Sequence, residues 1–178
     1  MKEIVAHSNS AGAVAENFQE FGTPKEILVP MDFSSASLNA LQTAVRVARQ
    51  HRSRITLLHV IDVKLCTYRA ETITVGREME EQARRKLTAI MQTIADEAIC
   101  TAKIVRGRPD REILKAAHAE KDTMIIMGKR LLGCWRFLHR NTVERVLERA
   151  DCEVIAVMEE NKRVFRDLRV GFERAKQG

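Results

Sequence analysis

The sequence predicts a single α/β domain with a doubly wound, Rossmann-like fold, in which helices cover both faces of a five-stranded parallel sheet. Short apolar runs alternate along the chain with segments whose apolar residues recur every three or four positions, as strands alternating with helices do. The runs are largely apolar on both faces, which is typical of strands buried in a parallel sheet. The length of 178 residues suits one domain with its own core.

The expected strands are the apolar runs at residues 26–31, 55–61, 101–105, 123–127 and 153–158. The second run is uninterrupted by charge and is therefore expected near the centre of the sheet. Successive parallel strands need crossover connections, and these are right-handed in nearly all known cases.

Four helices are expected between these strands. The first begins near Ser34 or Ser35, because its apolar residues share one helical face. These residues are Leu38, Leu41, Val45 and Ala48. The segment 76–98 is the strongest helix in the chain, with an apolar stripe opposite a surface of Glu and Arg.

The two later helices are shorter. One is expected around residues 113–117, after Pro109, whose missing N–H is not needed at a helix start. The other is expected at residues 143–150, and long connections are expected at residues 62–75 and 128–140.

Two segments flank the predicted domain, which spans residues 24–158. Residues 1–23 form an extension rich in Ala, Ser, Gly and Asn with no sustained periodicity, and residues 159–178 form a charged tail. The polar residues at positions 7–10 interrupt the apolar stretch that a signal peptide needs, so we expect a cytoplasmic protein.

The composition and charge of the chain argue against several classes of binding partner. The chain has 30 Lys and Arg against 24 Asp and Glu, a net charge of +6, with 4% aromatic residues. This modest charge and the few stacking side chains disfavour a single-stranded nucleic-acid binder. The apolar runs are too short to cross a membrane. The four cysteines are scattered without metal or redox spacing and are interpreted as ordinary reduced cysteines.

Ligands of open parallel sheets bind beyond the carboxyl ends of the strands, which directs attention to the residues that follow each strand. Asp32 follows the first, Val60 to Asp62 the second, Gly107 the third, and a loop beginning at Gly128 the fourth. Asp32 has two interpretations that the local sequence leaves open. It could bond a ribose or ring nitrogen, or it could cap the helix that starts at Ser34.

Several catalytic and cofactor motifs are absent. The sequence has no P-loop, no Gly-x-Gly-x-x-Gly after the first strand and no Gly-x-Ser-x-Gly elbow. The five histidines show no metal-ligand spacing, and His59, within an apolar strand, is interpreted as a core histidine. We therefore do not expect an enzyme.

Several segments together resemble the universal stress protein family over residues 24–158. They are Ile27-Leu28-Val29-Pro30-Met31-Asp32-Phe33-Ser34, Leu57-Leu58-His59-Val60-Ile61-Asp62, Gly107-Arg108-Pro109, Met124-Ile125-Ile126-Met127-Gly128, and the closing stretch from Glu144 to Val157. The resemblance implies an adenine-nucleotide-hydrolase-like fold and a homodimer formed through the last strand, Glu153 to Met158. It also implies ATP or AMP as candidate ligands.

In the nucleotide-binding branch of that family, residues matching Pro30, Asp32 and Val60 hold the adenosine part. A Gly-x-x-Gly, nine further residues and then Gly-Ser or Gly-Thr hold the phosphates. Glycine there lets backbone N–H groups approach the anion at a helix N-terminus. The candidate cleft that the resemblance implies consists of Pro30, Asp32, Val60, Gly107, Met127, Gly128, Lys129, Arg130, Asn141 and Thr142.

The phosphate loop departs from this pattern. Gly128 matches the first glycine, but Leu131 stands at the second and Asn141 at the third, followed by Thr142. Aligning from Glu144 instead places Arg140 at the third glycine and implies a one-residue deletion. The loop keeps four bases and no acid: Lys129, Arg130, Arg136 and Arg140.

Bulky residues at 135–138 resemble the UspA branch, whose loop lacks the phosphate motif. The sequence therefore predicts a dimeric stress-response or regulatory protein with a degenerate phosphate loop and without efficient ATP binding. The alternative is an adenine-nucleotide sensor that uses the cleft at the carboxyl ends of strands 1, 2 and 4. Weak ATP hydrolysis would accompany only the second.

Overall fold

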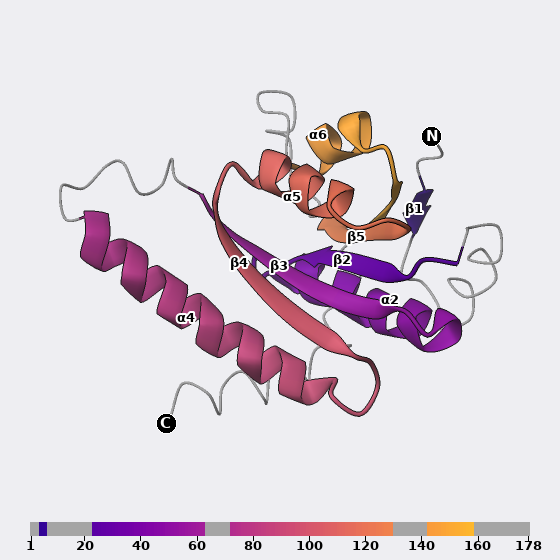
Figure 1. Cartoon of the computed structure of the whole chain (residues 1–178), viewed down its shortest axis with the longest axis horizontal. Coiled ribbons are helices and arrows are strands. Elements are labelled where there is room, and N and C mark those ends of the chain that lie inside the picture. Colours follow the sequence, from indigo (N-terminus) through magenta and orange to yellow (C-terminus); the bar gives the residue numbers. More distant parts are fainter. Residues whose placement is uncertain (1–3, 7–22, 63–71, 130–141, 159–178) are drawn as a thin grey trace.

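A computed structural model describes residues 4–6, 23–62, 72–129 and 142–158, and from β2 onward strands and helices alternate along the chain (Figure 1). The strands are β1 (Ile4–Ala6), β2 (Glu26–Pro30), β3 (Arg54–Asp62), β4 (Cys100–Gly107), β5 (Thr123–Lys129) and β6 (Glu153–Met158). The helices are α2 (Ser35–His51), α4 (Thr72–Thr93), α5 (Pro109–His118) and α6 (Thr142–Arg149).

All strand pairs are parallel, in the order β1-β6-β5-β2-β3-β4. The chain adds β3 and then β4 on one side of β2, returns to place β5 on the other side, and continues outward to β6. This is the doubly wound arrangement that the alternating pattern predicts, with a change of direction between β2 and β5.

Two hydrophobic cores lie on opposite faces of the sheet. Helices α2 and α4 cover one face and α5 and α6 the other (Figure 1). Alternate residues of β2 show the division, because Ile27 and Val29 belong to the first core and Leu28 to the second. These side chains are at most 2% exposed, which explains why the strands read as unbroken apolar runs.

Helix α2 begins where the sequence predicts. Ser34 is its N-cap, and its hydroxyl accepts a hydrogen bond from the Ser37 backbone N–H at 3.3 Å. At the other end Arg52 adopts the left-handed conformation, φ 57°, and its N–H donates to the Ala48 carbonyl. Both ends of the helix therefore have partners for backbone groups that a helix leaves unsatisfied.

The structure confirms the α/β fold and all five predicted strands, and it differs in three details: where the strongest helix begins, where it ends, and the presence of a sixth strand. The strongest helix runs from Thr72 to Thr93 rather than over 76–98, so the connection before it is shorter than predicted. After Thr93 the chain continues in turns, with the Ile94 N–H bonded to the Met91 carbonyl at 3.2 Å. Ile94 stays buried there, which is why it fitted the helical stripe.

The third difference is a sixth strand. Residues 1–23 were expected to lie outside the domain, but Ile4–Ala6 pairs with β6 at the edge of the sheet. Three residues are too few for a periodicity to be recognised, so the sequence pattern did not indicate this strand. Within the described residues, no helix combines the length and apolar character needed to cross a membrane.

Candidate functional site

The change of direction in the sheet lies between β2 and β5. Their pairing runs from Glu26 opposite Thr123 to Leu28 opposite Ile125, although both strands continue to Pro30 and Lys129. The ladder thus stops before the carboxyl ends of the two strands. Ligands of open α/β sheets bind at this position, so this end of the sheet is the candidate site.

A tight turn follows β2 at this end. The Asp32 Oδ1 atom accepts hydrogen bonds from the Ser34 backbone N–H at 3.0 Å and from the Ser34 hydroxyl at 2.5 Å. Phe33 between them has a positive φ of 62°, which is uncommon for a bulky residue. Ser34, and not Asp32, is thus the N-cap, and the Asp32 carboxylate instead holds the turn that leads into α2.

The Phe33 ring is held by residues from two other elements. It lies 4.6 Å from the His59 ring, centroid to centroid, and the Lys86 ammonium lies 5.0 Å from its centroid. His59 Nδ1 donates to the Met31 carbonyl at 2.7 Å, so this histidine has a hydrogen-bond partner, although it is half-buried rather than in the core. Nothing in the local sequence signals the positive φ of Phe33 or its contact with Lys86.

Gly128 lies against the first turn of α2. A Cβ at this position would be 2.2 Å from the carbonyl carbon and oxygen of Ala36 and 2.6 Å from the Ser37 nitrogen. Real Cβ atoms do not approach backbone so closely, so only glycine fits. The missing side chain therefore allows the end of β5 to pack on the helix N-terminus.

The other predicted residues at this end take different positions. Pro30 is half-buried and pairs with Leu58 of β3, while Val60 lies two residues further along β3. Met127 is 4% exposed and packs in the core of the α5 and α6 face. Gly107 lies opposite Asp62 on the edge strand β4, so β3 separates it from β2.

A charged cluster marks the same end of the sheet on the α5 and α6 face. Asp110, 2% exposed, accepts hydrogen bonds from the Arg108 guanidinium at 2.9 and 3.3 Å, and Arg149 of α6 lies 3.8 Å away. Burial alone would raise the pKa of the Asp110 carboxyl. The hydrogen bond and charge of Arg108, with the charge of Arg145, instead hold the pKa below its ordinary 3.8.

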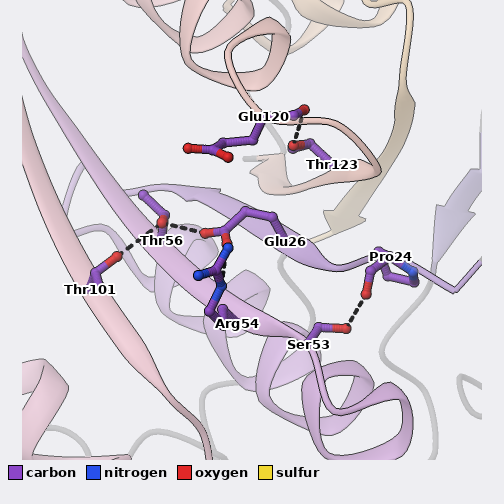
Figure 2. Close-up of polar contacts among 8 residues, drawn as sticks. All are labelled: Pro24, Glu26, Ser53, Arg54, Thr56, Thr101, Glu120 and Thr123. Carbon is purple, nitrogen blue, oxygen red and sulfur yellow. Dashed lines mark hydrogen bonds and ion pairs between the residues drawn. The ribbon is translucent and has the colours of Figure 1, made fainter.

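A second polar cluster lies at the opposite, amino-terminal ends of the strands (Figure 2). The buried Glu26 carboxyl accepts a hydrogen bond from the Thr56 hydroxyl, and Arg54 Nε lies 3.3 Å from its other oxygen. The Thr56 and Thr101 hydroxyls are 3.0 Å apart. Because the partners of Glu26, which is on β2, lie on β3 and β4, we interpret this cluster as a set of contacts that stabilises three neighbouring strands.

Cys100 begins β4 beside this second cluster. Burial, with a smaller contribution from the Glu26 charge, raises the pKa of its thiol to about 11. The thiol is therefore protonated at neutral pH and is a poor nucleophile or metal ligand. Among the described residues, no group of three His, Cys, Asp or Glu side chains could hold a metal ion.

Comparison with known proteins adds the family. The pattern of the Universal stress protein family matches residues 24–158. The chain belongs to the universal stress protein family. This confirms the resemblance that the sequence motifs indicate.

Individual similar proteins agree with this assignment. Universal stress protein MJ0531 of Methanocaldococcus jannaschii is 26% identical over 143 residues, which cover 78% of this chain and 84% of that protein. The structure of hypothetical protein MJ0577 matches with a TM-score of 0.69 and 26% identity, covering 79% of this chain and 100% of that one.

A more distant structure shares the fold. An Arabidopsis thaliana universal stress protein family member, solved with AMP bound, matches with a TM-score of 0.58 and 18% identity. The match covers 81% of this chain and 97% of that one.

Only some of the predicted site residues of this universal stress protein lie within the described residues. Pro30 ends β2, Asp32 follows it, Gly128 and Lys129 end β5, and Val60 lies near the end of the neighbouring strand β3, while α6 begins at Thr142. Arg130 and Asn141 lie outside the described residues, as do the loop positions 131 and 135–138.

Proposed function

We propose that this universal stress protein is a regulatory protein that acts as a homodimer and does not bind ATP efficiently. The observation that carries the proposal is that Gly128 packs against the first turn of α2. Its missing side chain, which a phosphate site would use for close backbone approach, is already needed for packing on Ala36 and Ser37 of α2.

Two further features support weak nucleotide binding. Asp32, at the adenosine end of the family pattern, already accepts two hydrogen bonds from Ser34 through one oxygen. At the phosphate end, Leu131 and Asn141 stand where the pattern has glycine. Leucine lacks the backbone freedom that glycine supplies at an anion site, and asparagine, which tolerates left-handed geometry better than most residues, is only a partial substitute. The proposal therefore includes no catalytic step on a nucleotide.

An adenine-nucleotide sensor is the second candidate, and one observation favours it. The N-terminus of α2 lies directly against Gly128, and Lys129 follows at the end of β5, so a helix dipole and a cation are near the same end of the sheet. The Arabidopsis thaliana relative with AMP bound has the same fold. In this candidate, basic residues of the loop replace the glycine amides.

Titration calorimetry with ATP and AMP tests the nucleotide part on protein freed of endogenous ligand. We expect no measurable heat at millimolar ligand. Micromolar binding that Asp32→Ala weakens at least tenfold would overturn the proposal and favour the sensor. Ser34→Ala is the matched control, because it disturbs the same cap of α2 while keeping the Asp32 carboxylate.

Sedimentation equilibrium tests the homodimer. We expect a species of about twice the 20.2 kDa chain mass to appear as the concentration rises. If neither the whole chain nor a chain shortened by residues 2–6 dimerises at hundreds of micromolar, the homodimer is contradicted, whatever the result with nucleotide.

A further inference from the structure

The outer edge of β6 is covered by the chain's own first strand. β1 pairs in parallel with β6, placing Ile4, Val5 and Ala6 opposite Ile155, Ala156 and Val157. β6 therefore has a neighbour on each side, β1 and β5, although the predicted dimer of this family uses the same strand.

The two edges of the sheet differ in the charge that an unpaired edge strand would present to another chain. β4 forms one edge, and its exposed residues include Lys103 and Arg106, charges of the kind that discourage pairing with another chain. The middle of β6, from Val154 to Val157, is wholly apolar and buried. Without β1 this strand would present an uncharged edge, which is a template for another strand.

A second copy and β1 cannot use this edge together. Two identical strands that meet across a two-fold axis run antiparallel, whereas β1 runs parallel to β6. Both arrangements nevertheless need the same outward-facing N–H and C=O groups of residues 155–157. Occupation by one therefore excludes the other.

β1 is also suited to leaving the sheet. It has three residues, fewer than the five or six of a typical strand, and it leaves Glu153, Val154 and Met158 outside its register. It lies three strands from β2, a distance of roughly 14 Å at ordinary strand spacing. The chain from Ala6 to Glu26 spans several times that distance when extended, so β2 can stay in place when β1 departs.

We propose that β1 is a removable cover of the β6 edge, and that the homodimer forms through this edge only when β1 leaves it. The occupant that replaces β1 is β6 of a second copy. The inference rests on the homodimer of the proposed function and adds the segment that controls it.

Removing residues 2–6 tests the cover directly. Sedimentation velocity over a range of concentrations should give a dimer dissociation constant at least tenfold lower for the shortened chain than for the whole chain. Equal dimerisation of both chains would overturn the cover and leave the homodimer standing. A shortened chain that dimerises more weakly would also overturn it, because β1 would then help the dimer. No dimer from either chain would contradict the homodimer as well.

A reversible disulfide between β1 and β6 tests the same proposal in the whole chain, so its result does not depend on whether the shortened chain folds correctly. Ala6 and Val157 are register partners, and neighbouring strands bring Cα atoms within the range that a disulfide spans. The double variant Ala6→Cys, Val157→Cys should stay monomeric when oxidised and dimerise like the whole chain when reduced. Each single-cysteine variant controls for other disulfides. A locked chain that dimerises normally would overturn the proposal.

Discussion

Gly128 shows how one residue of the family motif can have a packing role. The first turn of α2 occupies the space where its Cβ would lie, and the colliding atoms are backbone, which cannot rotate away. We expect Gly128→Ala to lower the free energy of unfolding by about 3 kcal/mol, near the upper end of ordinary overpacking costs. Urea unfolding followed by circular dichroism measures the change.

Gly76 provides the matched control for this substitution. It lies within α4, and the three atoms nearest to a Cβ there would be those of the Arg106 guanidinium, at 3.5 to 3.6 Å, which is ordinary contact. Because alanine is the better helix former, Gly76→Ala should raise the free energy of unfolding, by up to about 1 kcal/mol. Equal losses in both variants would contradict a specific packing role for Gly128.

Asp110 makes stability depend on pH. Its pKa is held below 3.8, so its stabilisation is complete above that value and is lost as pH falls through the lowered pKa. Asp110→Asn leaves the half-buried Arg108 without its anionic partner and should cost about 1–3 kcal/mol at pH 7. The difference from the unchanged protein should shrink at pH values below the lowered pKa.

Urea unfolding at several pH values measures this difference. Asp122→Asn is the control, because the Asp122 pair with Lys25, at 2.9 Å, is exposed. It should change stability by less than about 1 kcal/mol at every pH. A cost for Asp110→Asn that stays constant down to acid pH would show that charge is not its origin.

At the scale of elements, the Glu26 cluster joins three strands at the end of the sheet opposite the candidate site (Figure 2). Thr56→Val keeps the shape and strand preference of the side chain but removes the donor to the carboxyl of Glu26, a residue that is 7% exposed. We expect a loss of about 1–3 kcal/mol in urea unfolding, the cost of an unsatisfied buried acceptor.

Thr101→Val is the matched control within the same cluster. Thr101 is exposed on β4, and its hydroxyl lies 3.0 Å from the Thr56 hydroxyl. Its replacement should change the free energy of unfolding by no more than about 0.5 kcal/mol. If both variants lose the same amount, the threonine pair matters rather than the buried carboxyl.

The sequence was informative where a pattern was long enough to have a period. The five longer strands and the start of α2 at Ser35 follow from apolar runs and a serine cap. The sequence does not predict β1, because three apolar residues in a segment of small residues have no recognisable periodicity. The predicted end of α4 lies a few residues too late, because Ile94 continues the apolar stripe of the helix after the helix has ended.

The candidate site was only partly predictable for a different reason. Its position follows from topology, since residues after parallel strands meet at one end of the sheet. The geometry within it depends on contacts between distant elements, such as Gly128 against Ala36 and Phe33 against His59. A local sequence pattern contains no information on such approaches, so it left open whether Asp32 is a cap or a ligand.

At the scale of the whole molecule, the net charge of +6 attracts any anion weakly and without specificity. This attraction must therefore be distinguished from specific recognition of a nucleotide. The separation uses ligand linkage, in which a ligand that binds only the folded chain raises the free energy of unfolding. A dissociation constant of about 1 mM gives only about 0.4 kcal/mol at an equal ATP concentration, whereas a thousandfold excess over the constant gives about 4.1 kcal/mol.

We expect millimolar ATP to stabilise the chain by less than about 0.5 kcal/mol, and inorganic tripolyphosphate to do the same. The physical reason is that the loop keeps its positive charge, while the backbone at Gly128 is already packed on α2 and the other pattern glycines are replaced. Urea unfolding with each ligand in turn measures both values at the same ionic strength. A stabilisation above about 3 kcal/mol by ATP but not by tripolyphosphate, abolished in Asp32→Ala and kept in Ser34→Ala, would require adenosine recognition. The nucleotide sensor would then replace the regulatory protein without efficient ATP binding as the function of this chain.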